Sequence, residues 1–278
     1  MAPRPLTLMA VHAHPDDEAT STGGILAKYA AEGIRTVLVT CTDGGCGDGP
    51  GGVKPGDEGH DPAAVARIRR AELDASAQAL GIGAVETLGY ADSGMMGWAA
   101  NDAPGAFWST PVADAAAKLA ELMRVHRPDV VVTYDPNGFY GHPDHIQAHR
   151  ITMAAAESTG IPAKLYWSAM SQSEMATFED RLREAGVEFP APEPGAGDAE
   201  GFPPGTPDED VTTVIDATAY AGAKYDALAA HASQSDGAFF LAMGRDAFAR
   251  IMGVESFVRV HDTTGAAVPE TDLLAGLR

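Results

Sequence analysis

The stretch LTLMAVHAHPDDEATSTGGILAKYAAEGIRTVLVT (residues 6–40) decides the fold class of this chain. It opens with a short apolar run at residues 6–12, which is typical of a buried strand. A helical pattern follows and ends at Gly33, and the β-branched residues 34–40 predict a second strand. A strand, a helix and a second strand in this order form a βαβ unit, in which the two strands are parallel and the crossover is right-handed.

The same alternation of strand and helix continues to residue 168. Further strands are expected at 85–88, 129–134 and 164–168, and helices at 63–80, 111–126 and 144–159. This pattern predicts an α/β fold, a Rossmann-like and mostly parallel sheet flanked by helices. With the usual strand order 3-2-1-4-5, the first and fourth strands are neighbours, and ligands bind in the crevice at their C-terminal ends.

Residues 169–278 are less regular and predict a smaller C-terminal lobe, which completes the same domain as the Rossmann-like core of residues 1–168. Residues 189–210 are rich in Pro, Gly and acidic side chains and predict a flexible excursion. The remaining elements expected in this lobe are helices at 174–186, 218–234 and 238–253 and strands at 211–215 and 257–260.

The charge balance excludes several classes of protein. Asp and Glu number 39 against 19 Lys and Arg, which gives a formal net charge of −20. Such an acidic chain lacks the basic surface that nucleic acids require, and anionic membranes would repel it. No apolar run approaches the roughly 18 residues of a membrane helix, and the first residues have no signal-peptide pattern. Because Cys41 and Cys46 are the only cysteines, we expect a soluble protein of the reducing cytoplasm, and its oligomeric state is left open.

Two short motifs follow the first and fourth predicted strands, at the edge where ligands bind. They are HAHPDDE (residues 12–18) and YGHPDH (residues 140–145). Two histidines and one carboxylate are sufficient to hold a catalytic zinc, and a further carboxylate can accept a proton from water. One such motif alone is usually a turn, whereas two at neighbouring strand ends predict a metal site.

The residues alone leave the ligand set open. His12 lies within the first strand and is expected to be a buried imidazole that points away from the site. His149 is a full turn into the following helix, although its spacing from His145 is known from zinc helices. The candidates from the two motifs and this helix are His12, His14, Asp16, Asp17, Glu18, His142, Asp144, His145 and His149.

The two motifs together resemble the PIG-L/LmbE-like family of zinc-dependent N-deacetylases, most of all its actinobacterial mycothiol-pathway branch. The resemblance is strong over about residues 6–168 and patchy afterwards. It extends over four further stretches, namely DSGM (92–95), TYDPNG (133–138), AHASQ (230–234) and ETDLLAGL (270–277). It implies the same α/β fold and the hydrolysis of an amide bond.

Carried across residue by residue, the resemblance implies a zinc site with a separate base. It makes His14, Asp17 and His145 the zinc ligands and Asp16 the general base that activates water. Iron(II) fits the same nitrogen and oxygen ligands.

The resemblance also implies roles for the residues around the metal. His142, oriented by Asp144, is implied as a protonated group that stabilises the oxyanion or protonates the leaving amine. Tyr140 is implied as a mobile side chain that polarises the amide carbonyl. Arg69 and Asp92 match positions that contact the sugar-type substrate, with Arg69 as the basic group at its edge.

These roles predict a zinc hydrolase that removes an acetyl group from an N-acetylglucosamine-type sugar or glycoconjugate and releases acetate. One alternative is an amidase that cuts larger amides such as mycothiol conjugates. That branch carries a lysine shortly after the first motif, whereas this chain has ATS at residues 19–21, which favours the deacetylase. A third alternative is a non-catalytic protein that binds a metal or a sugar, but such a protein has no need of Asp16 as a spare base.

The Gly-rich loop at residues 43–62 has no assigned role in these predictions. Its GCGDG segment (45–49) is similar to part of a dinucleotide fingerprint. However, the segment follows the second strand and no helix is expected to begin there, so a mobile loop over the crevice is favoured. Because this loop differs from that of the mycothiol enzymes, a secondary-metabolite glycoside is a further candidate substrate. Trp98, Phe107 and Trp108 can either stack on a sugar ring or pack in the core.

Overall fold

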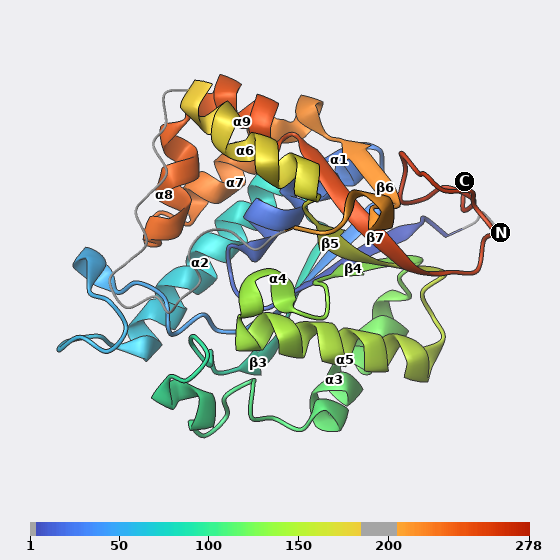
Figure 1. Cartoon of the computed structure of the whole chain (residues 1–278). Helices are drawn as coiled ribbons and strands as arrows, with labels where there is room; N and C mark the ends of the chain where they lie inside the picture. The colour runs from blue at the N-terminus through green and yellow to red at the C-terminus, as the bar shows by residue number, and fades with distance from the viewer. Residues whose placement is uncertain (1–3, 185–204) are drawn as a thin grey trace.

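A computed structural model describes residues 4–184 and 205–278. These residues form one seven-stranded sheet in the order β3-β2-β1-β4-β5-β7-β6 (Figure 1). The first five strands are parallel, which confirms the predicted order 3-2-1-4-5, and β7 is antiparallel to both β5 and β6. The strands are β1 (Thr7–His12), β2 (Arg35–Thr42), β3 (Ala84–Tyr90), β4 (Val130–Thr133), β5 (Lys164–Ala169), β6 (Thr213–Asp216) and β7 (Val254–Asp262).

Helices cover both faces of the sheet (Figure 1). α2 is well specified at its ends: the Asp61 side chain accepts hydrogen bonds from the first-turn amides, Pro62 occupies the first turn, and Gly81 ends the helix in the left-handed conformation. The helices are α1 (Gly23–Ala31), α2 (Pro62–Leu80), α3 (Val112–His126), α4 (Gly138–Gly141), α5 (Pro143–Thr159), α6 (Gln172–Glu184), α7 (Ala221–Ala230), α8 (Ser235–Ala242) and α9 (Gly244–Met252).

Alternating side chains of the buried strand β1 divide the core into two layers. Leu8 and Ala10 face the cluster formed with α1, α2, α7 and α9. Met9 and Val11 face the opposite cluster, formed with α3 and α5. This is the period of two that a strand covered on both faces requires. Each fully buried leucine or isoleucine of these clusters stabilises the fold by about 1.5–3 kcal/mol relative to an exposed one.

The C-terminal part of the chain adds two strands to the same sheet. β7 lies between β5 and β6, so the division of the domain at residue 168 stays a prediction. The single helix expected at 238–253 is wrong, because Gly244, with φ +71°, separates α8 from α9. The expected helix at 218–234 begins with a 3-10 turn (Thr218–Tyr220) and α7 then ends at Ala230. Most of the excursion expected at 189–210 lies outside the described residues.

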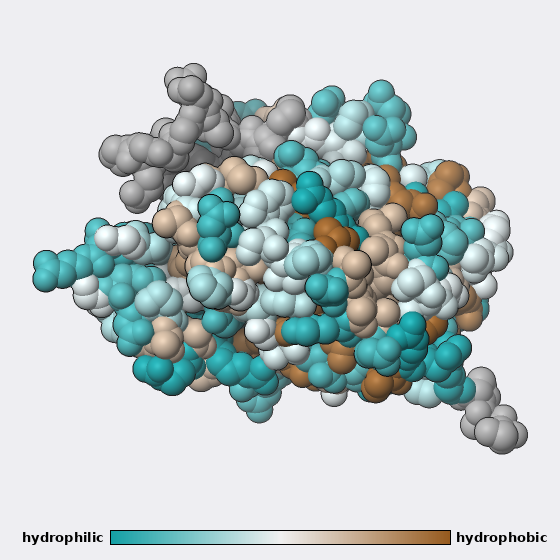
Figure 2. All heavy atoms as spheres, turned by 90° about the horizontal axis from the view of Figure 1, so that it is seen from below, coloured by the Kyte–Doolittle hydropathy of each residue, from teal (hydrophilic) through white to brown (hydrophobic). Residues whose placement is uncertain are grey.

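Hydrophilic residues cover much of the face seen in Figure 2. On the face seen in Figure 2, polar residues and scattered apolar residues alternate over the surface. Within residues 4–184 and 205–278, no helix combines the length and the hydropathy that crossing a bilayer requires.

β1 and β4 are hydrogen-bonded neighbours, with Leu8 opposite Val130 and Ala10 opposite Val132. Their C-terminal ends therefore meet at one edge of the sheet, where the two histidine motifs follow them. A π-helical turn (Glu18–Thr22) leads from the first motif into α1, and the second motif runs from α4 into α5. The topology thus brings the two motifs together.

Candidate active site

Three imidazoles from the two motifs converge at this edge. The ligand atoms of His14, His142 and His145 lie within 4.8 Å of one another, and all three residues are buried. His142 is the residue that precedes α5, and Pro143 starts the helix behind it, so His145 falls in the first turn. The helix start fixes the spacing of the two histidines, and the end of β1 supplies the third.

His145 presents a lone pair to the site. Its Nδ1–H donates to the carbonyl of Gly138 at 3.2 Å, which leaves Nε2 unprotonated in the neutral ring. Nε2 is buried and has no hydrogen-bond partner among the described residues, and Asp17 Oδ1 lies 3.4 Å away. An orphaned nitrogen facing a carboxylate oxygen is the arrangement that a cation between them stabilises.

Asp17 lies between His14 and His145, the two histidines that the resemblance places with it as zinc ligands. Its Oδ2 lies 3.3 Å from His14 Nδ1 and accepts hydrogen bonds of 2.7 Å from the His14 backbone N–H and from the Tyr134 hydroxyl. Burial raises the pKa of Asp17, but the opposing effect of His145 and His14 is larger, so the pKa lies well below its usual value. The carboxylate is therefore ionised and available as a metal ligand.

His14 lies among carboxylates. Its Nε2 is 3.3 Å from Asp144 Oδ2 and 3.6 Å from Asp92 Oδ1, and His14, Asp92 and Asp144 form a second group with metal-ligand spacing. Burial lowers the pKa of His14, but Asp92, Asp144 and Asp17 raise it well above its usual value. Buried negative charge thus exceeds what neutral imidazoles can balance, and a divalent cation fits this donor set.

Asp16 lies beside the cluster and is paired with the guanidinium of Arg69. Its Oδ2 accepts a 2.7 Å hydrogen bond from Arg69 Nη2, and about 26% of its side chain is exposed. Partial burial raises the pKa of Asp16 to about 6, although Arg69 lowers it. Its φ of +118° is rare for a residue other than glycine. A carboxylate that titrates near neutrality and opens to the site has the properties of a general base.

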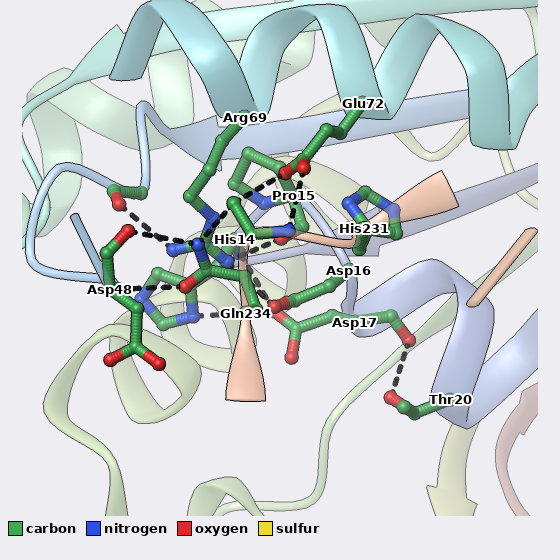
Figure 3. A network of polar contacts seen from close by, with 12 residues as sticks. His14, Pro15, Asp16, Asp17, Thr20, Asp48, Arg69, Glu72, His231 and Gln234 are labelled. Atoms are coloured by element: carbon green, nitrogen blue, oxygen red, sulfur yellow. Dashed lines mark hydrogen bonds and ion pairs between the residues drawn. The ribbon is translucent and has the colours of Figure 1, made fainter. Parts of the chain in front are cut away.

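Arg69 is a buried cation that contacts Asp16. Its guanidinium donates to the carbonyls of Gly44, at 2.8 Å, and Pro15, and the residue is only 4% exposed (Figure 3). It reaches from α2 to these two carbonyls, and the Gly44 carbonyl also accepts a 3.0 Å hydrogen bond from the Gly47 N–H. In this conformation it contacts the predicted base, and its contact with the sugar stays a prediction.

Asp92 is also buried among protein groups. Its carboxylate accepts hydrogen bonds from the backbone N–H groups of Gly94 (2.8 Å) and Cys46 (3.1 Å). Burial raises its pKa, but His14 and the Gly94 N–H lower it below its usual value. Asp92 therefore ties His14 to the loop after β3 and to the Gly-rich loop.

His142 is held by the backbone of Asp144. The Asp144 N–H donates to His142 Nδ1 at 3.1 Å, while the Asp144 carboxylate accepts a 2.9 Å hydrogen bond from the Ser93 N–H. Burial, His14 and His145 together lower the pKa of His142 to about 2. Because Nδ1 accepts, the proton of a neutral His142 ring lies on Nε2, and the protonated role that the resemblance implies stays a prediction.

Tyr140 covers the histidines from the solvent side. It is 49% exposed, and its ring lies edge-on to His145, with centroids 5.1 Å apart, and to His142, at 6.0 Å. Phe139, the residue before it, has φ +64°, which is strained for a bulky side chain. The turn therefore holds Tyr140 over the site in a conformation that local preference alone would not select.

The other two histidine candidates lie outside this cluster. His12 is fully buried, with Nδ1 3.2 Å from the Tyr134 hydroxyl and Nε2 2.8 Å from Thr22 Oγ1. His149 Nδ1–H donates to the Tyr134 carbonyl at 3.0 Å. Neither belongs to a group with metal-ligand spacing within the described part of the chain.

A comparison with models of protein families shows which family this chain belongs to. The PIG-L family model, described as GlcNAc-PI de-N-acetylase, matches residues 9–156, which is more than half of the chain and includes both histidine motifs. The chain belongs to the PIG-L family.

Similar proteins extend the PIG-L match to almost the whole chain. The 1D-myo-inositol 2-acetamido-2-deoxy-alpha-D-glucopyranoside deacetylase of Streptomyces griseus is 42% identical over 97% of this chain and 88% of its own length. The solved N,N'-diacetylchitobiose deacetylase of Pyrococcus horikoshii has a TM-score of 0.56 and 20% identity, over 91% of this chain and 83% of that one. A solved 4-carboxy-2-hydroxymuconate hydratase from Pseudomonas putida has a TM-score of 0.59 and 20% identity, over 94% and 99%. The last comparison indicates that the fold alone does not specify the reaction.

Two groups that have no role in the implied mechanism belong to this PIG-L site: Tyr134 and the candidate ligand Glu18, which lies outside the groups with metal-ligand spacing among the described residues. The Tyr134 hydroxyl donates to Asp17, and its ring stacks on His145 with centroids 4.2 Å apart. Tyr134 directly follows β4, within the TYDPNG stretch of the resemblance, which implies no role for it. Glu18 is fully buried and pairs with His231, which lies 213 residues further along the chain, so no local pattern connects them.

The Gly-rich loop packs against the site instead of presenting a nucleotide cradle. The Cys46 N–H faces the Asp92 carboxylate, and the Gly44 carbonyl binds Arg69. A Cβ at Gly44 or Gly47 would lie 2.6 Å from Arg69 Nη1, which explains why glycine is needed at both positions. Since the loop amides already face an acid, they are not arranged for a phosphate.

Of the three aromatic candidates, one is a core residue. Phe107 is fully buried and stacks on Tyr90 with centroids 5.1 Å apart. Trp108 lies under the Arg150 guanidinium, which is 4.9 Å from its ring. Trp98 is 41% exposed, the most exposed of the three.

Proposed function

We propose that this chain is a zinc-dependent N-deacetylase that removes the acetyl group from an N-acetylglucosamine-type sugar linked to inositol. The observation that carries the proposal is the combination of an ionised, buried His–Asp cluster with a separate carboxylate, Asp16, that is partly exposed beside it. Membership of the PIG-L family and the name of the Streptomyces griseus relative support the reaction and the substrate class. A screen of N-acetylated sugars, inositol glycosides and thiol conjugates with the zinc-loaded protein tests it, and acetate is expected from the inositol glycoside.

His14, Asp17 and His145 would hold the zinc. The orphaned Nε2 of His145 and the two oxygens of Asp17 between the histidines support this set. When bound, zinc supplies Lewis acidity, which polarises a carbonyl and makes water acidic enough to lose a proton near neutral pH. The nitrogen and oxygen donors fit iron(II) as well, so metal analysis of the purified protein identifies the native ion.

The chain's own residues then carry the proton transfers. Asp16 accepts a proton from the water that attacks the acetyl carbonyl carbon. His142 donates its Nε2–H to the developing oxyanion, and the Tyr140 hydroxyl donates to the same oxygen. As the carbon–nitrogen bond breaks, the proton held by Asp16 passes to the leaving nitrogen, and the products are acetate and a free amine. A neutral His142 is sufficient for this role, because a neutral imidazole N–H is already a hydrogen-bond donor.

The ligand set can be tested by zinc affinity, independently of turnover. Asp17→Asn is expected to weaken zinc binding by more than the roughly 10–100-fold that loss of an outer partner causes. His142→Gln is expected to keep zinc and to lower kcat by roughly 10²–10³-fold, as loss of an oxyanion donor does. Competition with a chromogenic chelator measures both affinities. Loss of zinc from His142→Gln with retention in Asp17→Asn would assign the site to the three histidines instead.

The acidic limb of the pH–rate profile is expected to report Asp16. As a base, Asp16 is active only when deprotonated, so kcat/KM falls as the pH drops through its pKa. That pKa is about 6 in the metal-free chain, and a bound cation lowers it further. Arg69→Gln removes a positive charge that lowers the pKa of Asp16, so the acidic limb of the profile is expected to move to higher pH. Arg69→Lys keeps the charge and is expected to leave the acidic limb in place.

The matched control for this experiment is Arg70→Gln on the same helix. Arg70 is exposed and pairs with Asp74 at 3.1 Å, so its replacement is expected to leave the profile unchanged. An acidic limb that stays in place, or moves to lower pH, in Arg69→Gln would assign the limb to a group other than Asp16.

A further inference from the structure

Glu18 is a buried carboxylate whose two oxygens have different partners. Oε2 accepts a 2.9 Å hydrogen bond from the backbone N–H of Asp16. Oε1 accepts from the Ser76 hydroxyl of α2 and lies 2.7 Å from Nε2 of His231, in the segment after α7. Glu18 and Ser76 are fully buried, and His231 is 2% exposed. One carboxylate thus connects three parts of the chain by hydrogen bonds: the loop after β1, the helix α2, and the segment after α7.

The partner of Oε2 is a strained residue. Asp16 has φ +118°, and such a conformation in a non-glycine residue persists only where the surroundings determine it. Rotation about its N–Cα bond swings Cβ, and therefore the carboxylate, relative to the rest of the site. The Glu18–N–H hydrogen bond restrains this rotation directly.

The side chain of Asp16 is restrained from the opposite side. Arg69 reaches it from α2, while His231 approaches the same loop from the segment after α7 (Figure 3). The Asp16 carbonyl also accepts a 3.0 Å hydrogen bond from the N–H of Ala19. Glu18 therefore fixes the backbone of Asp16, and Arg69 fixes its carboxylate.

Stability alone does not explain a buried Glu–His pair at this place. Two apolar side chains of similar volume would stabilise the interior as well, because burying two charges removes them from water. Apolar groups cannot accept a hydrogen bond from the Asp16 N–H, whereas the Glu18 carboxylate does. Ser76 and His231 hold this carboxylate in one orientation.

We propose that Glu18, held by His231 and Ser76, is a positioning residue that keeps the backbone of Asp16 in its strained conformation and so aims the Asp16 carboxylate at the substrate. Its effect on rate rests on the proposed function, in which Asp16 is the base. Its effect on the conformation of Asp16 does not depend on any reaction.

The test compares variants that keep or remove the acceptor. Glu18→Leu removes it and is expected to lower kcat about tenfold to hundredfold, as a displacement of about 1 Å does, with KM and zinc content near wild type. Glu18→Gln keeps an oxygen that can accept from the Asp16 N–H, so it is expected to recover most of that loss. The double variant Glu18→Leu/His231→Leu removes both partners of the buried pair, which avoids an unpaired imidazole and protects folding.

A matched control and a crystal structure separate positioning from a general loss of stability. Glu72 on α2 accepts 2.8 Å hydrogen bonds from the N–H and hydroxyl of Ser233, two residues after His231, and among the described residues it has no hydrogen bond to the Asp16 loop. Glu72→Gln is therefore expected to lower Tm without lowering kcat. In crystals of the Glu18→Leu variants, Asp16 is expected to relax to a negative φ and to lose its contact with Arg69.

Two results would overturn the proposal: kcat within twofold of wild type in folded Glu18→Leu or in the double variant, or a positive φ with the Arg69 contact intact in their crystal structures. Failure of the proposed function is a different outcome. In that case the wild-type protein releases no acetate from any N-acetylated sugar, and the crystal structures still report whether Glu18 sets the conformation of Asp16.

Discussion

Asp16→Asn is expected to bind zinc like the wild-type protein and to have a kcat lower by about 10²–10⁴-fold, the usual contribution of a general base. The amide has nearly the same shape and its oxygen can still accept the Arg69 hydrogen bond of 2.7 Å, so the fold is preserved. However, an amide cannot accept the proton of the attacking water. Acetate release measures kcat, and elemental analysis measures zinc.

The control for this variant is Asp74→Asn on the exposed face of α2. Asp74 pairs with Arg70 and is more than half exposed, so kcat and zinc content are both expected to stay at wild-type values. A wild-type kcat in Asp16→Asn would place the base elsewhere. Loss of zinc would make Asp16 a ligand and not the base.

His14→Ala is expected to lose both zinc and turnover. His14 is the residue common to both groups with metal-ligand spacing, and it also lies 3.3 Å from Asp17. Its loss removes one ligand and leaves Asp17, Asp92 and Asp144 facing one another without an imidazole between them, so the remaining donors repel. The fall in kcat is expected to equal or exceed that of Asp16→Asn, because the metal is lost as well.

His149→Ala is the histidine control for this experiment. His149 comes from the same motif region, but its Nδ1–H binds the Tyr134 carbonyl outside the cluster. It is expected to keep full zinc content, measured by elemental analysis after dialysis. Full zinc in His14→Ala, or loss of zinc in His149→Ala, would assign the metal to different ligands.

Local patterns in the sequence were sufficient to predict the parallel half of the sheet. Each βαβ unit is specified by neighbouring residues, and the chirality of the crossover then fixes the order of the first five strands. β7 is different, because it enters between β5 and β6 as an antiparallel strand, and pairing over such a distance has no local signature. The break at Gly244 has no clear local signal either, since an isolated glycine in a helical pattern either is tolerated or ends the helix.

The part of the site that was predictable from the sequence is the part that the two histidine motifs supply, because each motif follows the end of a strand. The convergence of His14, Asp17 and His145 follows from the pairing of β1 with β4. The placement of Arg69 did not follow, because it depends on how α2 packs against the carbonyls of Pro15 and Gly44 in two loops far from it in the sequence. The lowered pKa of His142 depends on burial and on two neighbouring imidazoles, which a motif does not reveal.

The central claim is that this member of the PIG-L family hydrolyses an acetamide with the help of a bound metal. The shared fold does not establish this by itself, since the hydratase from Pseudomonas putida has the same fold. The most direct test measures acetate and free amine released from N-acetylglucosaminyl-inositol by the zinc-loaded chain, by the chelator-treated chain, and by that chain after zinc is restored. We predict equal amounts of acetate and amine, loss of both with chelator, and recovery with zinc. Equal rates with and without metal, or no acetate from the zinc-loaded chain, would contradict the claim.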